Sequence, residues 1–223
     1  GEKGPDGSYK YDNLPNYRYV NVEYDTYKYT RKSSNAAAVK TLCGKKMCRF
    51  AQFPQGRAVM PSILEELLAA RKATRKLIPQ QEDEFMKNVL DKRQLSIKVT
   101  ANSLYGQTGA KTSSFYEVDV AASTTATGRK LLKYAERMIE EVYGNTEVDV
   151  EGYGRVRTRA ERVYGDTDSV FATFNFEELD GTPIEGQRAL EMTIVLAQEA
   201  GKLASMFLKK PHDLEYEKTF LAF

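Results

Sequence analysis

The sequence predicts an α+β fold, in which antiparallel strands pack with helices and a helical hairpin forms a separate part. Tyrosines alternate with polar residues early in the chain, apolar residues recur at helical spacing after Pro61, and an Asp-x-Asp sequence lies between two runs of β-forming residues. The 223 residues are 41% hydrophobic and 11% aromatic, which is enough to bury a core.

The first sixty residues form a Tyr-rich β segment. Its β-forming residues alternate with Asn, Asp and Gly, and turn signals stand at Pro5 and Pro15, so we expect short strands joined by loops. Tyrosines in such a run can stack on nucleic-acid bases. We interpret them instead as the half-buried face of a small sheet.

Two helices are expected next, over about residues 62–78 and 82–105. Pro61 and Ser62 favour a helix start, and Pro79 ends the first helix. The short polar loop between the helices predicts an αα-hairpin. On the first helix, Arg71 and Arg75 are four residues apart and therefore share a face.

The second helix carries a polar stripe. Lys98, Asn102 and Tyr105 are spaced i, i+4 and i+7, and an apolar stripe lies beside them, formed by Ile97, Ala101 and Leu104. An ordinary solvated face would show the same spacing. The two glycines that follow, Gly106 and Gly109, predict an abrupt helix end near Tyr105 and allow a close approach of the backbone to a ligand.

The remainder alternates between helix and strand. We expect a third helix over 121–143, strands over 148–156, 158–163 and 169–176, a fourth helix over 186–208 and a last strand over 213–220. The stretch 123–130 is superficially similar to a phosphate loop but lacks the leading Gly of that motif, which argues against P-loop enzymes.

The Asp-x-Asp sequence joins two predicted strands. In an extended backbone Asp166 and Asp168 point to the same side and Thr167 to the other. Two such carboxylates repel unless a cation lies between them, and Mg²⁺ prefers carboxylate and phosphate oxygens. A polar hairpin turn without a ligand is the alternative. A calcium loop is excluded, because Phe171 occupies the position where that loop requires Gly.

Charge and cysteine content narrow the classes of partner. The net charge is only +2, but basic residues cluster over 71–76 and 155–162, which indicates phosphate partners. Cys43 and Cys48 are too few for a zinc site, so we expect reduced thiols. No apolar run approaches the length of a membrane span. The absence of an initial Met leads us to expect a piece of a longer chain.

Two motifs carry a family resemblance. Residues 98–106 resemble the K-x-x-x-N-S-x-Y-G motif of family B DNA polymerases, and residues 164–169 resemble their Y-G-D-T-D-S motif, in the same order. Residues 214–218 resemble the segment before the basic primer-binding motif. The residues at 67–71 and 101–110 are most similar to those of replicative family members from eukaryotes and large DNA viruses, algal viruses in particular.

The resemblance implies an incomplete polymerase. Residues 61–106 would be the fingers, a helical hairpin, and 107–223 the palm, an antiparallel sheet with helices that includes the Asp-x-Asp hairpin; residues 1–60 would be an insertion in the palm. The thumb and the proofreading exonuclease would lie outside the chain. Nothing in residues 1–62 matches the upstream D-x-x-S-L-Y-P-S motif, which supplies another metal-binding aspartate.

The resemblance also implies roles for individual residues. Two Mg²⁺ ions would be held by Asp168 as the main ligand and by Asp166 as a weaker one. Lys98 would grip the triphosphate and protonate the leaving pyrophosphate, and the other nucleotide-binding residues would be Arg71, Arg75, Asn102 and Tyr105. Arg75 stands where the family pattern has Lys. The residues expected to contact DNA are Gly106, Tyr164, Gly165 and Thr167.

The implied reaction is template-directed DNA synthesis, the transfer of a deoxynucleotide from a dNTP to a primer 3′-hydroxyl. The implied partners are primer–template DNA, dNTPs and a sliding clamp or another processivity factor, and the implied location is the nucleus or a viral replication compartment. The chain alone is expected to be inactive. Two alternatives stay open, a polymerase-like DNA-binding scaffold without activity and a plain structural module.

Overall fold

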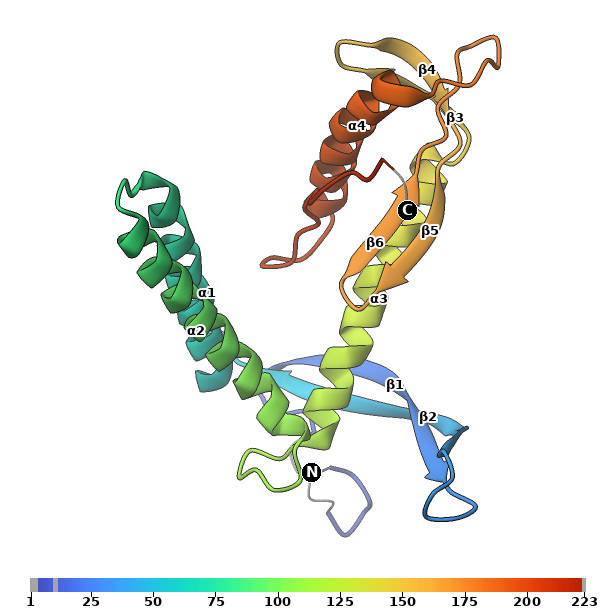
Figure 1. Cartoon of the computed structure of the whole chain (residues 1–223). Coiled ribbons are helices and arrows are strands. Elements are labelled where there is room, and N and C mark those ends of the chain that lie inside the picture. The colour runs from blue at the N-terminus through green and yellow to red at the C-terminus, as the bar shows by residue number, and fades with distance from the viewer. Residues whose placement is uncertain (1–3, 10–11, 222–223) are drawn as a thin grey trace. The chain divides into compact units, whose positions relative to one another are not determined.

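The computed structural model describes residues 4–9 and 12–221. Residues 1–3 and 10–11 of the expected Tyr-rich segment, and 222–223 of the expected palm, lie outside the described residues. The chain divides into two compact units, Gly1–Ala126 and Thr127–Phe223. The described residues combine helices with two-stranded antiparallel sheets, which confirms a mixed helix and sheet fold (Figure 1).

A single long hairpin dominates the start of the first unit. Strands β1 (Arg18–Thr30) and β2 (Val39–Gln52) pair antiparallel along their whole length. The expectation of several short strands was wrong, because polar residues such as Asn21 and Asp25 lie at exposed strand positions and do not break the ladder. The pairing register shifts once, between Thr26 and Tyr27, where a β-bulge lies in the hairpin.

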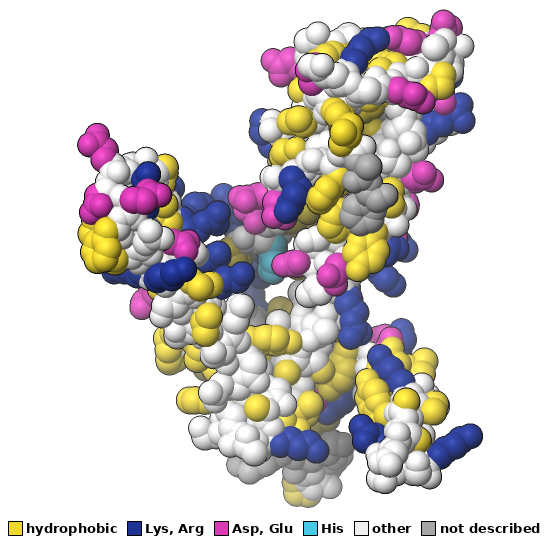
Figure 2. Space-filling view, in the orientation of Figure 1, with side chains coloured by type: hydrophobic (Ala, Val, Ile, Leu, Met, Phe, Trp, Pro, Cys, Tyr) yellow, Lys and Arg dark blue, Asp and Glu magenta, His cyan; other side chains and the backbone are white. Residues whose placement is uncertain are grey.

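The helical hairpin is close to the expectation. Helix α1 (Val59–Leu77) leads through the short 3₁₀ helix η1 (Ile78–Gln80) into α2 (Glu84–Gly109), and α1 and α2 pack side by side (Figure 1). Asp83 caps α2 by accepting a hydrogen bond from the Phe85 amide at 3.0 Å. Several apolar side chains stay at the surface of this hairpin (Figure 2), with Val59, Phe85 and Val99 more than half exposed.

The expected end of the second helix near Tyr105 was wrong. Helix α2 continues through Gly106 to Gly109, because Thr108 is buried and donates a hydrogen bond to the Tyr105 carbonyl at 2.7 Å. The Thr108 carbonyl in turn accepts from the Glu117 amide at 2.9 Å. These contacts hold the last turn in helical form despite the low helix propensity of glycine.

Helix α3 (Val118–Tyr143) begins three residues before the expected start and contains the division between the two units. The expected strand over 148–156 is interrupted by a turn at residues 151–153, where Gly152 has a φ of 82°. The remaining elements are β3 (Thr146–Val150), β4 (Gly154–Thr158), β5 (Glu161–Asp166), β6 (Ser169–Thr173) and α4 (Gly186–Met206).

The second unit has a well-defined hydrophobic core. Helix α4 contributes Met192, Leu196, Ala200 and Ala204. The end of α3 contributes Tyr143, the β3–β4 pair contributes Val150 and Val156, and the segment after β6 contributes Phe174 and Phe176. The rings of Tyr143 and Phe174 meet edge to face, with centroids 5.7 Å apart. This core supports the β3–β4 pair and α4.

The expected last strand over residues 213–220 was wrong, since these residues pair with no strand among the described residues. The segment is instead fixed against α4. Ser205 Oγ accepts from the Leu214 amide at 2.8 Å and donates to the Leu214 carbonyl at 3.2 Å. At Gly201 an added Cβ would lie 2.8 Å from that carbonyl oxygen, so the absence of a side chain permits this close approach.

Candidate nucleotide-binding and metal-binding sites

Helix α2 presents the expected polar stripe. Lys98, Asn102 and Tyr105 are exposed. On the adjacent stripe Ala101 is buried, while Ile97 and Leu104 are half-buried. The division of α2 into a packing face and an open polar face is therefore confirmed. An ammonium, an amide and a phenol on one open face can together contact phosphate, sugar and base.

Arg71 on α1 contacts α2. Its side chain is half-buried, and its Nε donates a hydrogen bond to Gln94 Oε1 at 3.2 Å. Gln94 Nε2 donates to Asp91 Oδ1 at 3.0 Å. Arg75, one turn further along α1, is exposed. The hairpin thus joins Arg71 to a row of hydrogen-bonded side chains and leaves Arg75 exposed to solvent.

The hydroxyl of Tyr105 is held by α3. It lies 2.8 Å from Thr125 Oγ1, to which it can donate, and 3.4 Å from the Ala121 carbonyl oxygen. Thr125 Oγ1 also donates to that carbonyl oxygen, at 3.0 Å. These contacts restrict the phenol ring at the end of the polar stripe.

The Asp-x-Asp sequence forms the tip of the β5–β6 hairpin. Asp166 pairs with Ser169, and Thr167 and Asp168 make a two-residue turn. The turn corrects our argument from an extended backbone, because strand alternation ends at Asp166. Thr167 has a φ of 43°, in the left-handed region that β-branched residues rarely adopt.

Both carboxylates at the tip are exposed. Asp166 Oδ1 accepts from the Thr167 hydroxyl at 2.9 Å, and Asp168 Oδ1 from the Ser169 hydroxyl at 3.4 Å. In the part of the chain that the structure describes, they belong to no group of three or more potential metal ligands. The pair therefore offers hard oxygen donors at an open turn.

Arg162 anchors this hairpin to α3. Its Nη1 donates to Glu136 Oε1 at 3.1 Å, and its backbone amide donates to Glu140 Oε1 at 3.2 Å. A Cβ at Gly165 would lie 3.2 Å from the Arg162 guanidinium, so this glycine leaves room for the ion pair. The rings of Tyr164 and Phe171 lie 5.7 Å apart across the two strands.

Comparison with known proteins decides the family. Residues 15–223 match the family model described as DNA polymerase family B. The chain belongs to DNA polymerase family B. This membership confirms the resemblance carried by residues 98–106 and 164–169.

Several family B polymerases are similar to this chain. It is 59% identical over its whole length to a DNA polymerase of Phaeocystis pouchetii virus, covering 21% of that protein. It is 36% identical over 164 residues, 74% of the chain, to the DNA polymerase delta catalytic subunit of Drosophila melanogaster, covering 13% of it. The chain thus spans about a fifth or less of the length of these relatives.

One solved structure is also similar, that of the family B DNA polymerase from the archaeon Pyrobaculum calidifontis. It matches with a TM-score of 0.41 and 26% identity, over 65% of this chain and 16% of that one.

The residues at the hairpin tip fit the chemistry of a magnesium site in a family B polymerase. Mg²⁺ usually retains several waters and binds one or two carboxylates together with substrate phosphates, so a site needs few protein ligands. Asp166 and Asp168 supply two carboxylates, and within the described residues their hydrogen-bond partners are the hydroxyls of adjacent residues. The cysteines fit a metal less well, because Cys43 is exposed, Cys48 is buried and both are free thiols.

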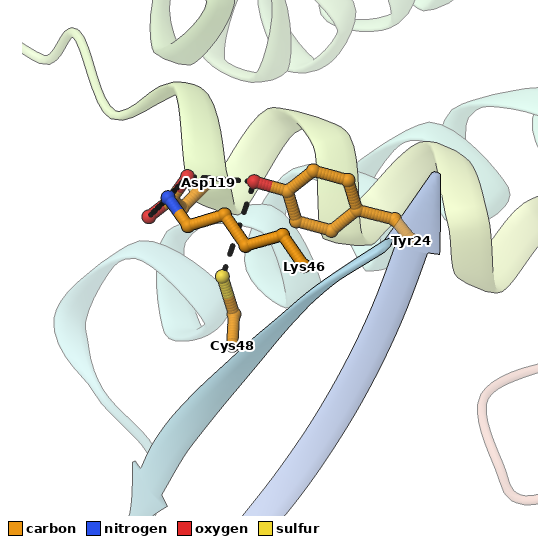
Figure 3. A network of polar contacts seen from close by, with 4 residues as sticks. All are labelled: Tyr24, Lys46, Cys48 and Asp119. Atoms are coloured by element: carbon orange, nitrogen blue, oxygen red, sulfur yellow. Dashed lines mark hydrogen bonds and ion pairs between the residues drawn. The ribbon is translucent and has the colours of Figure 1, made fainter. Parts of the chain in front are cut away.

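A polar network in the first unit was missed by the sequence reasoning. Asp119 in the first turn of α3 binds Lys46 of β2 and the Tyr24 hydroxyl of β1, and the Cys48 thiol lies 4.0 Å from that hydroxyl (Figure 3). The hydrogen bonds from Lys46 and Tyr24 hold the pKa of Asp119 below its usual value. Burial, followed by the contact with Asp119, raises the pKa of Tyr24.

Local spacing held a signal for one other group that was missed. Asp91 and Gln94 are three residues apart and Gln94 precedes Lys98 by four, so all three lie along one side of α2. No such spacing indicates the contact between Thr125 and Tyr105 or the one between Tyr24 and Asp119, because these residues meet only in the folded chain.

No helix within the described residues has the length and apolar character of a membrane span.

Proposed function

We propose that this chain forms part of the catalytic region of a DNA-directed DNA polymerase. The enzyme transfers a deoxynucleotide from a dNTP to the 3′-hydroxyl of a DNA primer on a template. One observation carries the proposal: a chain that matches the family B model along residues 15–223 keeps both exposed aspartates at a hairpin tip and an exposed polar stripe that begins with Lys98 on a helical hairpin.

The residues divide the work by charge. Lys98, Arg71 and Arg75 bind the triphosphate, because it carries several negative charges that develop further as pyrophosphate leaves. In this proposal Lys98 also gives a proton to the leaving pyrophosphate. Asn102 donates a hydrogen bond to phosphate or sugar. The Tyr105 ring, fixed through its hydroxyl by Thr125, packs against the minor-groove side of the new base pair.

Asp168 and Asp166 are the proposed ligands for two Mg²⁺ ions, with Asp168 the stronger. Bound magnesium would supply charge neutralisation at the phosphates and at the attacking hydroxyl. The proposed contacts to DNA near the primer terminus are made by Gly106, Tyr164, Gly165 and Thr167. In this assignment residues 61–106 are the fingers, residues 107–223 belong to the palm, and residues 1–60 are an insertion in the palm.

Further proposals follow from the relatives. The chain covers 21% of the viral DNA polymerase and contains no match to the D-x-x-S-L-Y-P-S motif in residues 1–62, so we propose that the 223 residues alone do not extend primers. We propose replication in the nucleus or at a viral replication site, with a sliding clamp or another processivity factor as partner, since the relatives include a viral polymerase and a delta catalytic subunit.

The test is magnesium-dependent primer extension by the full-length polymerase that contains this chain. Asp168→Asn keeps the size of the side chain and removes its charge, so extension should fall by several orders of magnitude while primer–template binding is kept. Asp180→Asn is the matched control, because Asp180 is also an exposed aspartate in a turn, where it accepts from the Thr182 amide at 2.9 Å. Unchanged extension in Asp168→Asn would mean that the Asp-x-Asp hairpin is only a turn and binds no catalytic metal. The DNA-binding scaffold would then be the remaining proposal.

A further inference from the structure

The side chain of Arg71 is held by one specific contact. Its Nε–H donates to Gln94 Oε1 at 3.2 Å, across the interface between α1 and α2. Gln94 is its polar partner among the described residues. Because the bond uses Nε, the outer edge of the guanidinium, with its two Nη groups, stays available for a bidentate contact to phosphate oxygens.

Asp91 determines which end of the Gln94 amide meets Arg71. The Gln94 amide has an accepting oxygen and a donating nitrogen, and only the oxygen can bond to a guanidinium. Asp91 Oδ1 accepts from Gln94 Nε2 at 3.0 Å, which directs Oε1 toward Arg71. If the amide turned over, two donors would face each other at Arg71 and two acceptors at Asp91. The carboxylate therefore sets the orientation of the amide.

A neutral side chain separates the acidic and basic groups in the row formed by Asp91, Gln94 and Arg71. The other carboxylate oxygen of Asp91 lies 3.8 Å from Lys92 Nζ, and the Asp91 side chain is 49% exposed. Gln94 stands between the acid and Arg71, so Arg71 is oriented by a neutral group and is not paired directly with a carboxylate. An arginine held in this way keeps its full charge for an anionic ligand, whereas a direct ion pair would compete with that ligand.

We propose that Gln94 and Asp91 are positioning residues for the nucleotide triphosphate, acting through Arg71. This inference rests on the proposed function, because it assumes that Arg71 binds the phosphates. The long arginine side chain otherwise samples many rotamers, and restricting it before the ligand arrives lowers the entropy cost of binding. The nucleotide-binding surface thus extends beneath Arg71 to two side chains that do not touch the ligand.

The experiment is single-turnover nucleotide incorporation by the full-length polymerase, which separates the apparent Kd for dNTP from the maximal rate. Gln94→Leu removes the acceptor at similar size and should raise the apparent Kd roughly five- to tenfold, the ratio that corresponds to one ordinary hydrogen bond, with little change in the maximal rate. Asp91→Ala should raise it in the same direction. Asp91→Asn retains an accepting oxygen and should restore most of the affinity.

A double-mutant comparison separates positioning from a structural role. In an Arg71→Ala background, Gln94→Leu should have no further effect on the apparent Kd. Asn88→Leu is the matched control, since Asn88 is an exposed amide on the same helix whose Nδ2 donates to the Glu84 carbonyl at 3.0 Å; its apparent Kd should equal that of the unaltered enzyme. A melting temperature for each variant reports any loss of folding.

The outcomes distinguish two failures. If Arg71→Ala leaves the apparent Kd unchanged, the role of Arg71 in the proposed function is wrong, and the inference falls with it. If Arg71→Ala raises the apparent Kd while Gln94→Leu does not, or if the effect of Gln94→Leu persists without Arg71, then the positioning role alone is overturned. A raised Kd for Gln94→Leu that disappears without Arg71 supports it.

Discussion

Asp119 accepts hydrogen bonds from the ammonium of Lys46 at both carboxylate oxygens, at 2.7 and 2.8 Å. The two residues are 73 positions apart. Their contact fixes the β1–β2 hairpin to the first turn of α3, within the first unit. The position of Asp119 near the helix N-terminus adds a favourable interaction with the helix dipole.

Loss of the Asp119 charge should weaken the first unit. Asp119→Asn should lower the free energy of unfolding by about 1 kcal/mol, because it removes a partly exposed ion pair and a charge near a helix N-terminus. Urea unfolding followed by tyrosine fluorescence measures this, since the chain has 14 tyrosines and no tryptophan. Glu141→Gln, an exposed position on the same helix, is the control. Equal losses in both variants would contradict a specific role for Asp119.

The same contact predicts a pH dependence. The hydrogen bonds from Lys46 and then from Tyr24 lower the pKa of Asp119 in the folded chain. A group with a depressed folded pKa stabilises the protein above its unfolded pKa, which for Asp is about 3.9, and this stabilisation is lost as the pH falls through the folded value. The difference in unfolding free energy between the unaltered chain and Asp119→Asn should therefore shrink below about pH 4. A difference that is constant from neutral pH to pH 2 would refute the assignment.

A side chain at Gly201 should disturb the segment that follows α4. The Cβ of Gly201→Ala would lie 2.8 Å from the Leu214 carbonyl oxygen and 3.6 Å from the Tyr216 amide nitrogen. Because these are backbone atoms, the segment must shift, and we expect a loss of about 1–3 kcal/mol in unfolding free energy.

The matched control for Gly201→Ala is Gly128→Ala in α3. An added Cβ at Gly128 meets nothing within 4 Å, so that variant should gain roughly 0.5–1 kcal/mol from helix propensity. Thermal unfolding of the two variants should thus shift in opposite directions. A Gly201→Ala variant as stable as the unaltered chain, or more stable, would show that the contact between Gly201 and Leu214 does not form.

Thr125 should influence nucleotide selection through Tyr105. Thr125→Val keeps the shape of the side chain but removes the hydroxyl that lies 2.8 Å from the Tyr105 hydroxyl. If the Tyr105 ring checks the new base pair, discrimination between correct and incorrect dNTPs in the full-length enzyme should fall by about fivefold, the effect of one hydrogen bond.

Tyr105→Phe removes the other partner of the same bond and should have a similar effect. The two substitutions together should cost no more than either alone. Additive losses of discrimination would mean that Thr125 acts independently of Tyr105. The ratio of kcat/KM for matched and mismatched nucleotides measures both.

Local patterns predicted most of the helices. Pro61 and Pro79 marked the ends of α1 to within a few residues, and the apolar spacing of Ile97, Ala101 and Leu104 gave the buried side of α2. The predicted end of α2 failed for a physical reason. Burial of Thr108 and its bond to Tyr105 stabilise a turn that glycine propensity alone disfavours.

Strands were predicted less well because they depend on partners. Residues 213–220 have the composition of a strand, but α4 binds their backbone through Ser205 and no strand edge among the described residues pairs with them. The motifs put Lys98 on the second helix and Asp168 in a turn between two strands, where the structure has them, while the roles of both residues stay predictions. Thr125 was not predicted, because its contact with Tyr105 joins two helices, and the contact of Gln94 with Arg71 does the same, although the spacing of Gln94 from Asp91 and Lys98 held a local signal.

Because the backbone at Thr167 is left-handed, threonine is not the residue that would make this turn most stable. A threonine in this conformation gives up about 1–2 kcal/mol relative to glycine. A library of variants selected only for heat resistance should therefore accumulate glycine or asparagine at position 167, whereas selection for accurate DNA copying should keep threonine. If the proposed function holds, a thermostable form of the polymerase that contains this chain would gain more from changes away from the hairpin tip than from relieving the strain at Thr167.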